Sequence, residues 1–209
     1  MAKDGIRQFV VGHLSTNCYA LVSDGKCLVI DPGADGAWIA NELNDVSVVG
    51  VVATHGHHDH VGGVRALCEA TGAPFMVSVG DAERSQRVLE LSSHVFDVSE
   101  GNVQDAPAPN RELREGDVID VGSLKLKVLE TPGHTEGGIV LLGDGFAFMG
   151  DTLFAGSCGR TDLVGGNHNT LMQSLARLKS AIPPSTVLLC GHGPATTMAT
   201  ELATNPFLQ

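Results

Sequence analysis

The chain has few aromatic residues, few basic residues and no long apolar run. Its 209 residues include one tryptophan and one tyrosine, and 13 Lys and Arg stand against 24 Asp and Glu, for a formal net charge of −11. Such a deficit of positive charge argues against binding to nucleic-acid backbones and to anionic membrane surfaces. No apolar run approaches the ~18 residues that a membrane-spanning helix needs. We therefore expect neither nucleic acid nor a membrane among its partners, and the sequence indicates no particular protein partner.

Paired cysteines are also absent. The chain has no CxxC pair, and its cysteines are scattered and odd in number: Cys18, Cys27, Cys68, Cys158 and Cys190. This distribution is typical of reduced thiols rather than of a disulfide framework. The first residues lack the apolar segment and cleavage pattern of a signal peptide. Together these absences predict a cytoplasmic protein.

Strand and turn patterns recur in the same order in two halves of the chain. Each half contains a hairpin, a strand that ends in an aspartate and a strand that ends in a histidine. The expected strands are residues 6–11, 17–22, 26–30, 48–53, 74–79, 118–121, 124–129, 139–142, 146–149 and 187–190. The expected helices are residues 36–43, 61–70, 81–91, 169–180 and 194–203. This pattern predicts two sheets covered by helices, with the site where the strand ends meet.

Two helix starts and the longest connection allow finer predictions. Asp35 stands where it would cap the helix that begins at residue 36. Pro194 suits the first position of the last helix. Residues 92–112 contain Pro107 and Pro109, many polar residues and no apolar period. We therefore expect an irregular surface loop over 92–112.

A ligand-rich segment, Thr54–His60 (THGHHDH), directly follows the apolar run Val48–Ala53. His55 and His57, two residues apart, could converge on one metal ion from an extended turn. Asp59 and His60 could then hold a second ion. A polar loop with several histidines is the alternative, but so many potential ligands within seven residues favour a metal site.

Three further candidate ligands follow apolar strands later in the chain: His134, Asp151 and His192. Taken singly, each of these histidines is more often structural. Together with the four residues of the first segment they form a set of seven nitrogen and oxygen ligands without cysteine, which suits a two-metal site. One ion would take three imidazoles, and the other two imidazoles and a carboxylate, with Asp151 as the bridge. Such ligands fit zinc, iron or manganese.

These segments resemble the motifs of a known family. Residues 54–60 resemble the THxHxDH signature of the metallo-β-lactamase superfamily, and residues 132–135, 150–154 and 191–194 resemble its later motifs. The resemblance extends from Asp31 to His192. It implies an α/β fold of the four-layer αββα sandwich type, with the metal site at one edge of the two sheets. It also implies a single domain over residues 1–209.

The resemblance implies a role for each candidate residue. The expected roles are first-metal ligands His55, His57 and His134, second-metal ligands Asp59, His60 and His192, the bridge Asp151, and a supporting Asp31 that steadies a ligand or its loop. Asp59 and Asp151 would also act in catalysis. His58 occupies the variable position of the signature, and we expect it outside the ligand set. His13, His94 and His168 are expected on the surface or in loops.

Two later segments indicate the branch of the superfamily. Residues 153–162 resemble the glyoxalase II and persulfide dioxygenase group, and residues 204–208 resemble the tail of single-domain glyoxalase II-like hydrolases. This resemblance implies hydrolysis of a thioester, with S-2-hydroxyacyl-glutathione such as S-lactoylglutathione as the leading substrate. Attack would come from a hydroxide shared by two divalent ions, zinc first, with iron and manganese as alternatives. A mononuclear iron persulfide dioxygenase, a hydrolase of another small ester or lactone, and a metal-stabilised binding module are the other readings.

Substrate recognition departs from the two-domain members of that group. The chain ends 17 residues after His192, without the helical C-terminal domain that helps those enzymes to bind glutathione. Arg160 matches a position where the group uses a basic residue against glutathione, although it could instead pair with Asp162. Asp162 itself stands where the group carries a tyrosine. Arg160 is therefore the candidate substrate-binding residue.

Overall fold

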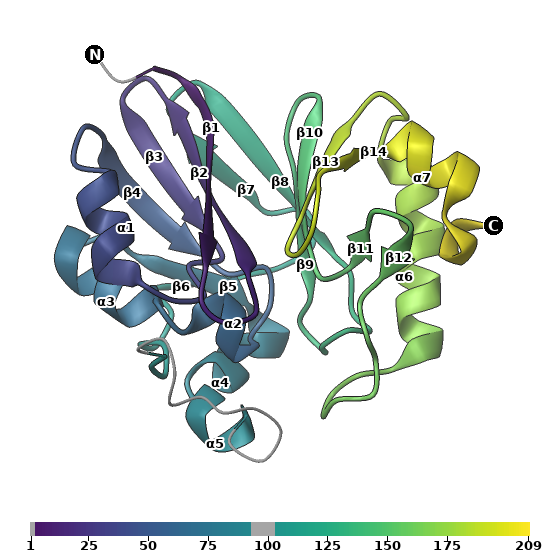
Figure 1. Ribbon diagram of the computed structural model, residues 1–209, viewed down its shortest axis with the longest axis horizontal. Coiled ribbons are helices and arrows are strands. Elements are labelled where there is room, and N and C mark those ends of the chain that lie inside the picture. The colour runs from purple at the N-terminus through teal and green to yellow at the C-terminus, as the bar shows by residue number, and fades with distance from the viewer. Residues whose placement is uncertain (1–2, 93–102) are drawn as a thin grey trace.

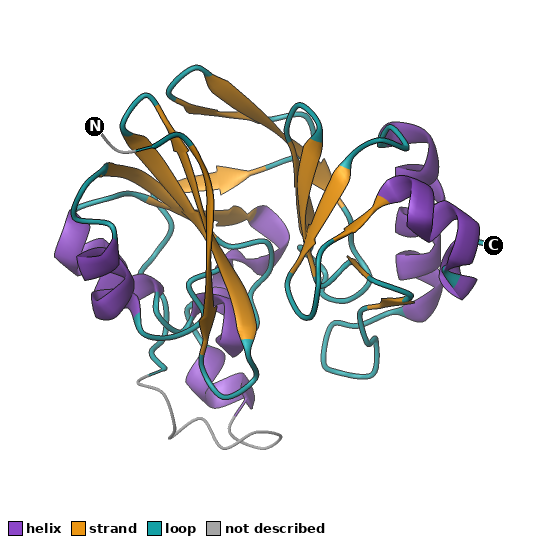
Figure 2. Cartoon of the chain, turned by 45° about the horizontal axis from the view of Figure 1, so that its top comes forward, coloured by secondary structure: helices purple, strands orange, loops and turns teal. Residues whose placement is uncertain are grey.

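The chain forms two β-sheets that pack face to face, with helices on both outer faces (Figure 1). The computed structural model describes residues 3–92 and 103–209. The layers follow one another as helix, sheet, sheet and helix, and Figure 2 shows the two groups of helices on opposite sides of the strands. The predicted αββα sandwich is therefore confirmed.

The first sheet contains the first six strands, side by side in chain order: β1 (Gly5–Val11), β2 (Thr16–Ser23), β3 (Lys26–Ile30), β4 (Ser47–Val52), β5 (Phe75–Ser78) and β6 (Arg111–Leu113). Strands β1 to β3 pair antiparallel, and β3 to β6 pair parallel. Asp24 and Gly25 turn β2 into β3 with φ angles of 53° and 70°. Two successive left-handed residues are what a tight hairpin of this hand requires.

The second sheet has the spatial order β14-β13-β10-β9-β8-β7. Its strands are β7 (Val118–Val121), β8 (Leu124–Glu130), β9 (Ile139–Leu142), β10 (Phe146–Gly150), β13 (Val187–Cys190) and β14 (Thr196–Thr197). Strands β10 and β13 pair parallel, and the other neighbours pair antiparallel. A separate small hairpin consists of β11 (Leu153–Phe154) and β12 (Ser157–Cys158).

The helices divide between the two outer faces and the site edge. Helices α1 (Gly36–Glu42) and α3 (Val64–Thr71) cover the first sheet, and α6 (His168–Ala181), α7 (Met198–Thr204) and the 3₁₀ turn η2 (Pro206–Leu208) cover the second. The short elements near the site edge are α2 (His58–Val61), η1 (Val79–Asp81), α4 (Ala82–Ser85) and α5 (Val88–Ser92). Within residues 3–92 and 103–209, no helix has both the length and the apolarity to cross a bilayer.

Alternate residues of the central strands point to opposite faces of each sheet, and both faces are buried. In β2, Cys18, Ala20 and Val22 pack with the helices of the outer face, whereas Tyr19 and Leu21 pack between the two sheets. Strands β8, β9 and β10 alternate in the same way between the inter-sheet core and a core against α6. This burial on both faces explains why the strands are continuous apolar runs.

The helix predicted over 61–70 is in fact two helices, α2 and α3, separated by Gly62 and Gly63. A Cβ atom on Gly63 would lie 2.7 Å from the carbonyl oxygen of Ala34. The break therefore lets the loop after β3 approach the backbone closely. It also places Asp59 and His60 inside α2.

The helix predicted over 81–91 is also broken, into η1, α4 and α5. The segment that begins at residue 103 takes hydrogen bonds that a continuous helix would make itself. The backbone N–H of Ala106 donates to the carbonyl of Ser85, and the N–H of Leu89 donates to the side chain of Asp105. Local periodicity cannot reveal such tertiary competition.

Two predicted helix starts and part of one predicted loop were wrong. Asp35 precedes α1, but its φ is 56° and its side chain makes no capping hydrogen bond. The last helix begins at Met198 rather than Pro194, because residues 196–197 pair with β13 and Thr197 is the capping residue. Of the loop predicted over 92–112, residue 92 ends α5, residues 93–102, including His94, lie outside the described residues, 103–110 are irregular, and 111–112 belong to β6.

Candidate metal centre

The candidate ligands meet where strand ends of both sheets converge. The parallel strands β3, β4 and β5 end on this side of the first sheet, and β10 and β13 end on the same side of the second. In α/β folds, loops at the carboxyl ends of parallel strands build ligand sites. The structure brings all seven predicted ligands together at this edge.

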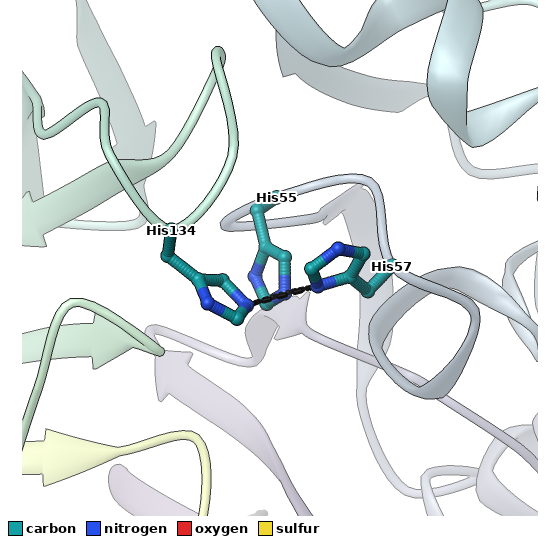
Figure 3. Close-up of side chains that lie close together, drawn as sticks. All are labelled: His55, His57 and His134. Atoms are coloured by element: carbon teal, nitrogen blue, oxygen red, sulfur yellow. Dashed lines mark hydrogen bonds between the residues drawn. The ribbon is translucent and has the colours of Figure 1, made fainter. Parts of the chain in front are cut away.

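Three histidines form the first cluster, and their ring nitrogens point at one another (Figure 3). Nδ1 of His57 lies 3.0 Å from Nε2 of His55 and 2.9 Å from Nε2 of His134. The two Nε2 atoms of His55 and His134 are 3.2 Å apart. Ligands around a tetrahedral metal at ~2.0–2.1 Å are separated by roughly 3.3 Å. The triangle of nitrogens therefore has nearly the size that one bound ion requires.

The second cluster joins Asp59, His60 and His192. Oδ2 of Asp59 lies 3.1 Å from Nε2 of His192 and 3.5 Å from Nε2 of His60. All three ligand atoms lie within 4.8 Å of one another. One carboxylate and two imidazoles could thus hold a second ion beside the first.

Asp151 lies between the two clusters. Its Oδ2 is 3.6 Å from Nε2 of His134 in the first cluster and 3.6 Å from Nε2 of His192 in the second. Its Oδ1 is 3.3 Å from Nε2 of His60. Among the described residues, Asp151 Oδ1 and His60 Nε2 are buried polar atoms without hydrogen-bond geometry to any partner. Buried orphans of this kind are costly, and a cation between them would satisfy both.

Asp31 holds the ligand loop that follows β4. Its Oδ1 accepts the backbone N–H of Thr54 at 2.7 Å, and its Oδ2 accepts the Thr54 hydroxyl at 2.7 Å. The same Oδ2 lies 3.0 Å from Nδ1 of His60. This contact lacks hydrogen-bond geometry, so Asp31 acts on the far nitrogen of His60 through its charge. Asp31 has a φ of 54°, so this placement comes with a strained backbone.

Asp81 was not predicted as a site residue, although it is completely buried beside the ligand loops. Its Oδ2 accepts the N–H of Gly56 at 2.8 Å and the hydroxyl of Thr135 at 2.6 Å, and its Oδ1 accepts the N–H of Gly137 at 3.2 Å. Asp81 therefore ties the loop of His55 and His57 to the loop of His134. A sequence signal existed, since Asp81 follows a predicted strand as Asp31 does.

Burial and charge give the two clusters different proton affinities. Burial lowers the pKa of His55 well below its ordinary value and the pKa of His57 to about 3, so both imidazoles stay neutral and available as ligands. Burial also lowers the pKa of His60, but the carboxylates of Asp151 and Asp59 outweigh it and leave the pKa raised. Metal binding at the second cluster would therefore release a proton.

Three other histidines lie outside the ligand set. His58 is buried, with its ring stacked at 5.8 Å on the ring of His13. His13 is exposed in the turn after β1, and His168 is exposed at the start of α6. None of the three belongs to a metal-ligating group among the described residues.

A cleft of about 460 Å³ opens onto the ligands. Its apolar wall consists of Leu14, Val88, Leu91, Phe154, Leu163 and Val164. Arg84 and Arg160 are the two arginines among its described lining residues. Nη2 of Arg84 donates to the carbonyl of Val164 at 2.7 Å, and Nε lies 3.4 Å from Asp81.

Arg160 lies at the cleft with two distinct contacts. Its backbone carbonyl is 2.7 Å from Nδ1 of His134, so it can accept that N–H and orient the ring. Its guanidinium forms a two-point pair with Asp162, with both contacts at 2.7 Å. The Arg160 and Asp162 side chains are 52% and 66% exposed, so the pair is worth little and an anionic ligand could compete with it.

A family model described as the metallo-beta-lactamase superfamily matches residues 11–192. The chain belongs to the metallo-beta-lactamase superfamily. The predicted membership is confirmed, and the two-sheet fold agrees with it. An uncharacterized protein of Aquifex aeolicus is 39% identical over 97% of this chain and 96% of its own length.

Two superfamily relatives carry the name hydroxyacylglutathione hydrolase. GloC of Haemophilus influenzae is 31% identical over 92% of both chains. The hydroxyacylglutathione hydrolase of Rhodospirillum rubrum is 34% identical over 87% of this chain, which spans 64% of that protein.

Two solved structures are similar over nearly the whole chain. The BLEG-1 B3 metallo-beta-lactamase superposes with a TM-score of 0.89 at 29% identity, covering 98% of this chain and 100% of that one. TTHA1623 in a di-iron-bound form superposes with a TM-score of 0.85 at 32% identity, covering 97% and 100%.

Proposed function

We propose that this chain is a metal-dependent thioester hydrolase that uses two divalent ions, with S-2-hydroxyacyl-glutathione as its leading substrate. The position of Asp151 carries the proposal, because its carboxylate lies at 3.6 Å from one histidine of each cluster. The relatives named hydroxyacylglutathione hydrolase support the substrate class. The di-iron form of TTHA1623 supports the use of two ions by a similar protein and leaves zinc, iron and manganese all open here.

The proposed ligand set assigns the first ion to His55, His57 and His134, the second to Asp59, His60 and His192, and the bridge to Asp151. When bound, divalent ions supply Lewis acidity, which lowers the pKa of water and polarises a carbonyl group. The pKa values of His55 and His57 are lowered, so these two imidazoles can offer their lone pairs to an ion without first losing protons. Asp59 faces the cleft, and its Oδ2 accepts the Thr16 hydroxyl at 3.2 Å. We expect this carboxylate to orient the attacking water.

The residues of the cleft allow hydrolysis without a covalent intermediate. Cys158 lines the cleft, but burial raises the pKa of its thiol, which therefore stays protonated at neutral pH. The apolar wall excludes water from one side of the bound ester. Arg160 would release Asp162 and pair instead with a carboxylate on the thiol portion of the substrate.

The decisive experiment combines metal analysis with an assay on S-lactoylglutathione. We expect two ions per chain, and release of lactate and free thiol in equal amounts. Asp151→Ala should reduce kcat by more than the roughly 100-fold that loss of a supporting group costs. A rate within threefold of the parent would overturn the bridging role. Arg160→Ala should raise KM with little change in kcat.

A mononuclear iron persulfide dioxygenase is the second candidate. The observation in its favour is that the three nitrogens of the first cluster, 2.9–3.2 Å apart, form a complete set for one ion without the second cluster. That enzyme would contain one iron per chain and consume oxygen with glutathione persulfide. Oxygen uptake with one iron, and no thiol release from S-lactoylglutathione, would replace the first proposal. Other small esters and lactones should be assayed beside S-lactoylglutathione as alternative substrates for hydrolysis.

A further inference from the structure

The residues of the second cluster come from different sheets. Asp59 and His60 lie in α2, which follows β4 of the first sheet, whereas His192 follows β13 of the second. The side chain of His192 is 27% exposed, against 0% for His60. Packing therefore constrains His192 less than it constrains His60. The position of His192 must therefore depend on what fixes its loop.

Strand β2 of the first sheet fixes the His192 loop through Asn17. The backbone N–H of Asn17 donates to the carbonyl of Gly191 at 2.8 Å. Its side-chain Nδ2 donates to the carbonyl of Cys190 at 3.0 Å and to the carbonyl of Gly193 at 2.8 Å. One residue of the opposite sheet thus binds carbonyls on both sides of His192.

The side chain of Asn17 is itself held in place. It is 3% exposed, and its Oδ1 accepts Nε2 of Gln8 at 2.7 Å from the neighbouring strand. The hydroxyl of Tyr19, two residues along β2, donates to the same Cys190 carbonyl at 2.8 Å. Both donors of the Asn17 amide and its oxygen are therefore occupied, which leaves one orientation for the group.

The start of β2 contacts the other half of the cluster as well. Thr16, the residue before Asn17, donates its hydroxyl to Oδ2 of Asp59 at 3.2 Å. Adjacent residues of one strand therefore contact both the carboxylate of the second cluster and the loop of its exposed histidine. We propose that Asn17 is a positioning residue that sets His192 against Asp59 and so determines whether the second metal site is complete. This inference rests on the two-metal site proposed above.

The chemistry requires an amide at this position. Only an amide offers two N–H donors to two carbonyls while its oxygen accepts a third group. In Asn17→Asp the shape is kept, but a carboxylate oxygen replaces both donors and faces two carbonyl oxygens. In Asn17→Ala the side-chain contacts are lost. In both variants the backbone bond to Gly191 remains.

The test is a titration of Zn²⁺ into metal-free parent, Asn17→Ala and Asn17→Asp proteins. Calorimetry and metal content after gel filtration report the number and affinity of the sites. For both variants we expect one tight site as in the parent, and a second site weakened by roughly 10–100-fold, the range seen for groups that orient metal ligands. Tyr19→Phe, which removes one of two donors to Cys190, should weaken the second site less.

Ser23→Ala is the matched control on the same strand. Ser23 lies at the other end of β2, is buried, and also contacts the second sheet, through the hydroxyl of Ser123 at 3.1 Å. It should retain both sites with parental affinities. Thermal unfolding of the metal-free proteins checks that each variant folds. If one Asn17 variant does not fold, the other carries the test together with Tyr19→Phe, which removes a single hydroxyl donor.

The outcomes separate this inference from the proposed function. Two parental sites in folded Asn17→Asp would overturn the positioning role, and so would an equal loss of affinity at both sites. A parent protein that binds fewer than two ions would instead overturn the two-metal site itself.

Discussion

At the scale of single residues, buried carboxylates organise this site as much as the ligands do. Asp31 and Asp81 each accept hydrogen bonds from backbone and hydroxyl groups of ligand loops. A buried carboxylate needs such partners, because an unsatisfied buried charge is costly. Each aspartate therefore requires its loops to adopt one conformation.

Replacement of Asp81 should weaken the first cluster. Asp81→Ala leaves two backbone N–H groups and the Thr135 hydroxyl without an acceptor, at about 1–3 kcal/mol for each buried group left unpaired. We expect weaker binding at the site of His55, His57 and His134, measured by metal titration, and a lower free energy of unfolding. Asp120→Ala, which removes an exposed pair with Lys125, is the control and should change neither. Parental metal affinity in the Asp81 variant would contradict the role.

The buried imidazoles should make the metal-free protein sensitive to acid. The pKa of His57 is lowered to about 3 in the folded chain, whereas an unfolded histidine titrates near ~6.5. The unfolded state therefore binds a proton first, and stability is lost as the pH falls from ~6.5 toward 3. His57→Gln lacks this linkage. The free energy of unfolding of the parent minus that of the variant, measured by denaturant unfolding in chelator, should decrease between pH 7 and pH 4. A difference that does not change with pH would contradict the lowered pKa of His57.

At the scale of elements, close backbone approaches decide where the ligands lie. The loop after β3 passes directly beneath α2, and a Cβ on Gly33 would lie 1.5 Å from the carbonyl oxygen of Asp59. The positions of the strands were predictable, because a strand buried on both faces is an apolar run of local sequence. The separation of α2 from α3 depends on this tertiary contact and was not.

Substitution at Gly33 should displace α2 and disturb the second cluster. Because the obstructing atom belongs to the backbone, Gly33→Ala forces α2 to shift. Overpacking of this kind typically costs about 1–3 kcal/mol of folding free energy or more. We expect lower thermal stability and weaker binding of the second ion. Gly72→Ala is the control: Gly72 has a φ of 71° and no atom near its Cβ position, so it should cost roughly 1–2 kcal/mol of strain with metal binding unchanged. Equal metal affinities in the two variants would refute this account.

At the scale of the whole molecule, the candidate centre joins the two sheets. The first cluster takes His55 and His57 from the loop after β4 and His134 from the loop after β8. The second cluster crosses the same boundary. Bound ions would therefore connect the two halves of the sandwich at one edge, in addition to the apolar core between the sheets.

Metal removal should lower the stability of the whole fold. Ions that bind only the folded chain stabilise it in proportion to the logarithm of their concentration over the dissociation constant. We expect chelation to lower Tm and added metal to restore it. His134→Ala combined with His192→Ala, which removes the second sheet's histidines, should abolish most of that difference. A Tm that is independent of chelator would rule out a structural contribution from the ions.

The amino-acid sequence by itself determined the superfamily, the positions of most strands and the identity of the candidate ligands. These depend on residues close together in the chain or on residue types that recur at strand ends, so they can be recognised locally. The spacing within residues 54–60 identified His55, His57, Asp59 and His60 as candidate ligands before any fold was known.

Only the tertiary structure decided which residues hold those ligands in place. Asp81 reaches loops 25 and 56 residues away, and Asn17 reaches a loop 173 to 176 residues away. No local pattern encodes such contacts, because they exist only once both sheets are packed. The physical reason is that the type of a residue determines whether it can bind a metal ion, whereas long-range hydrogen bonds determine how its side chain is oriented.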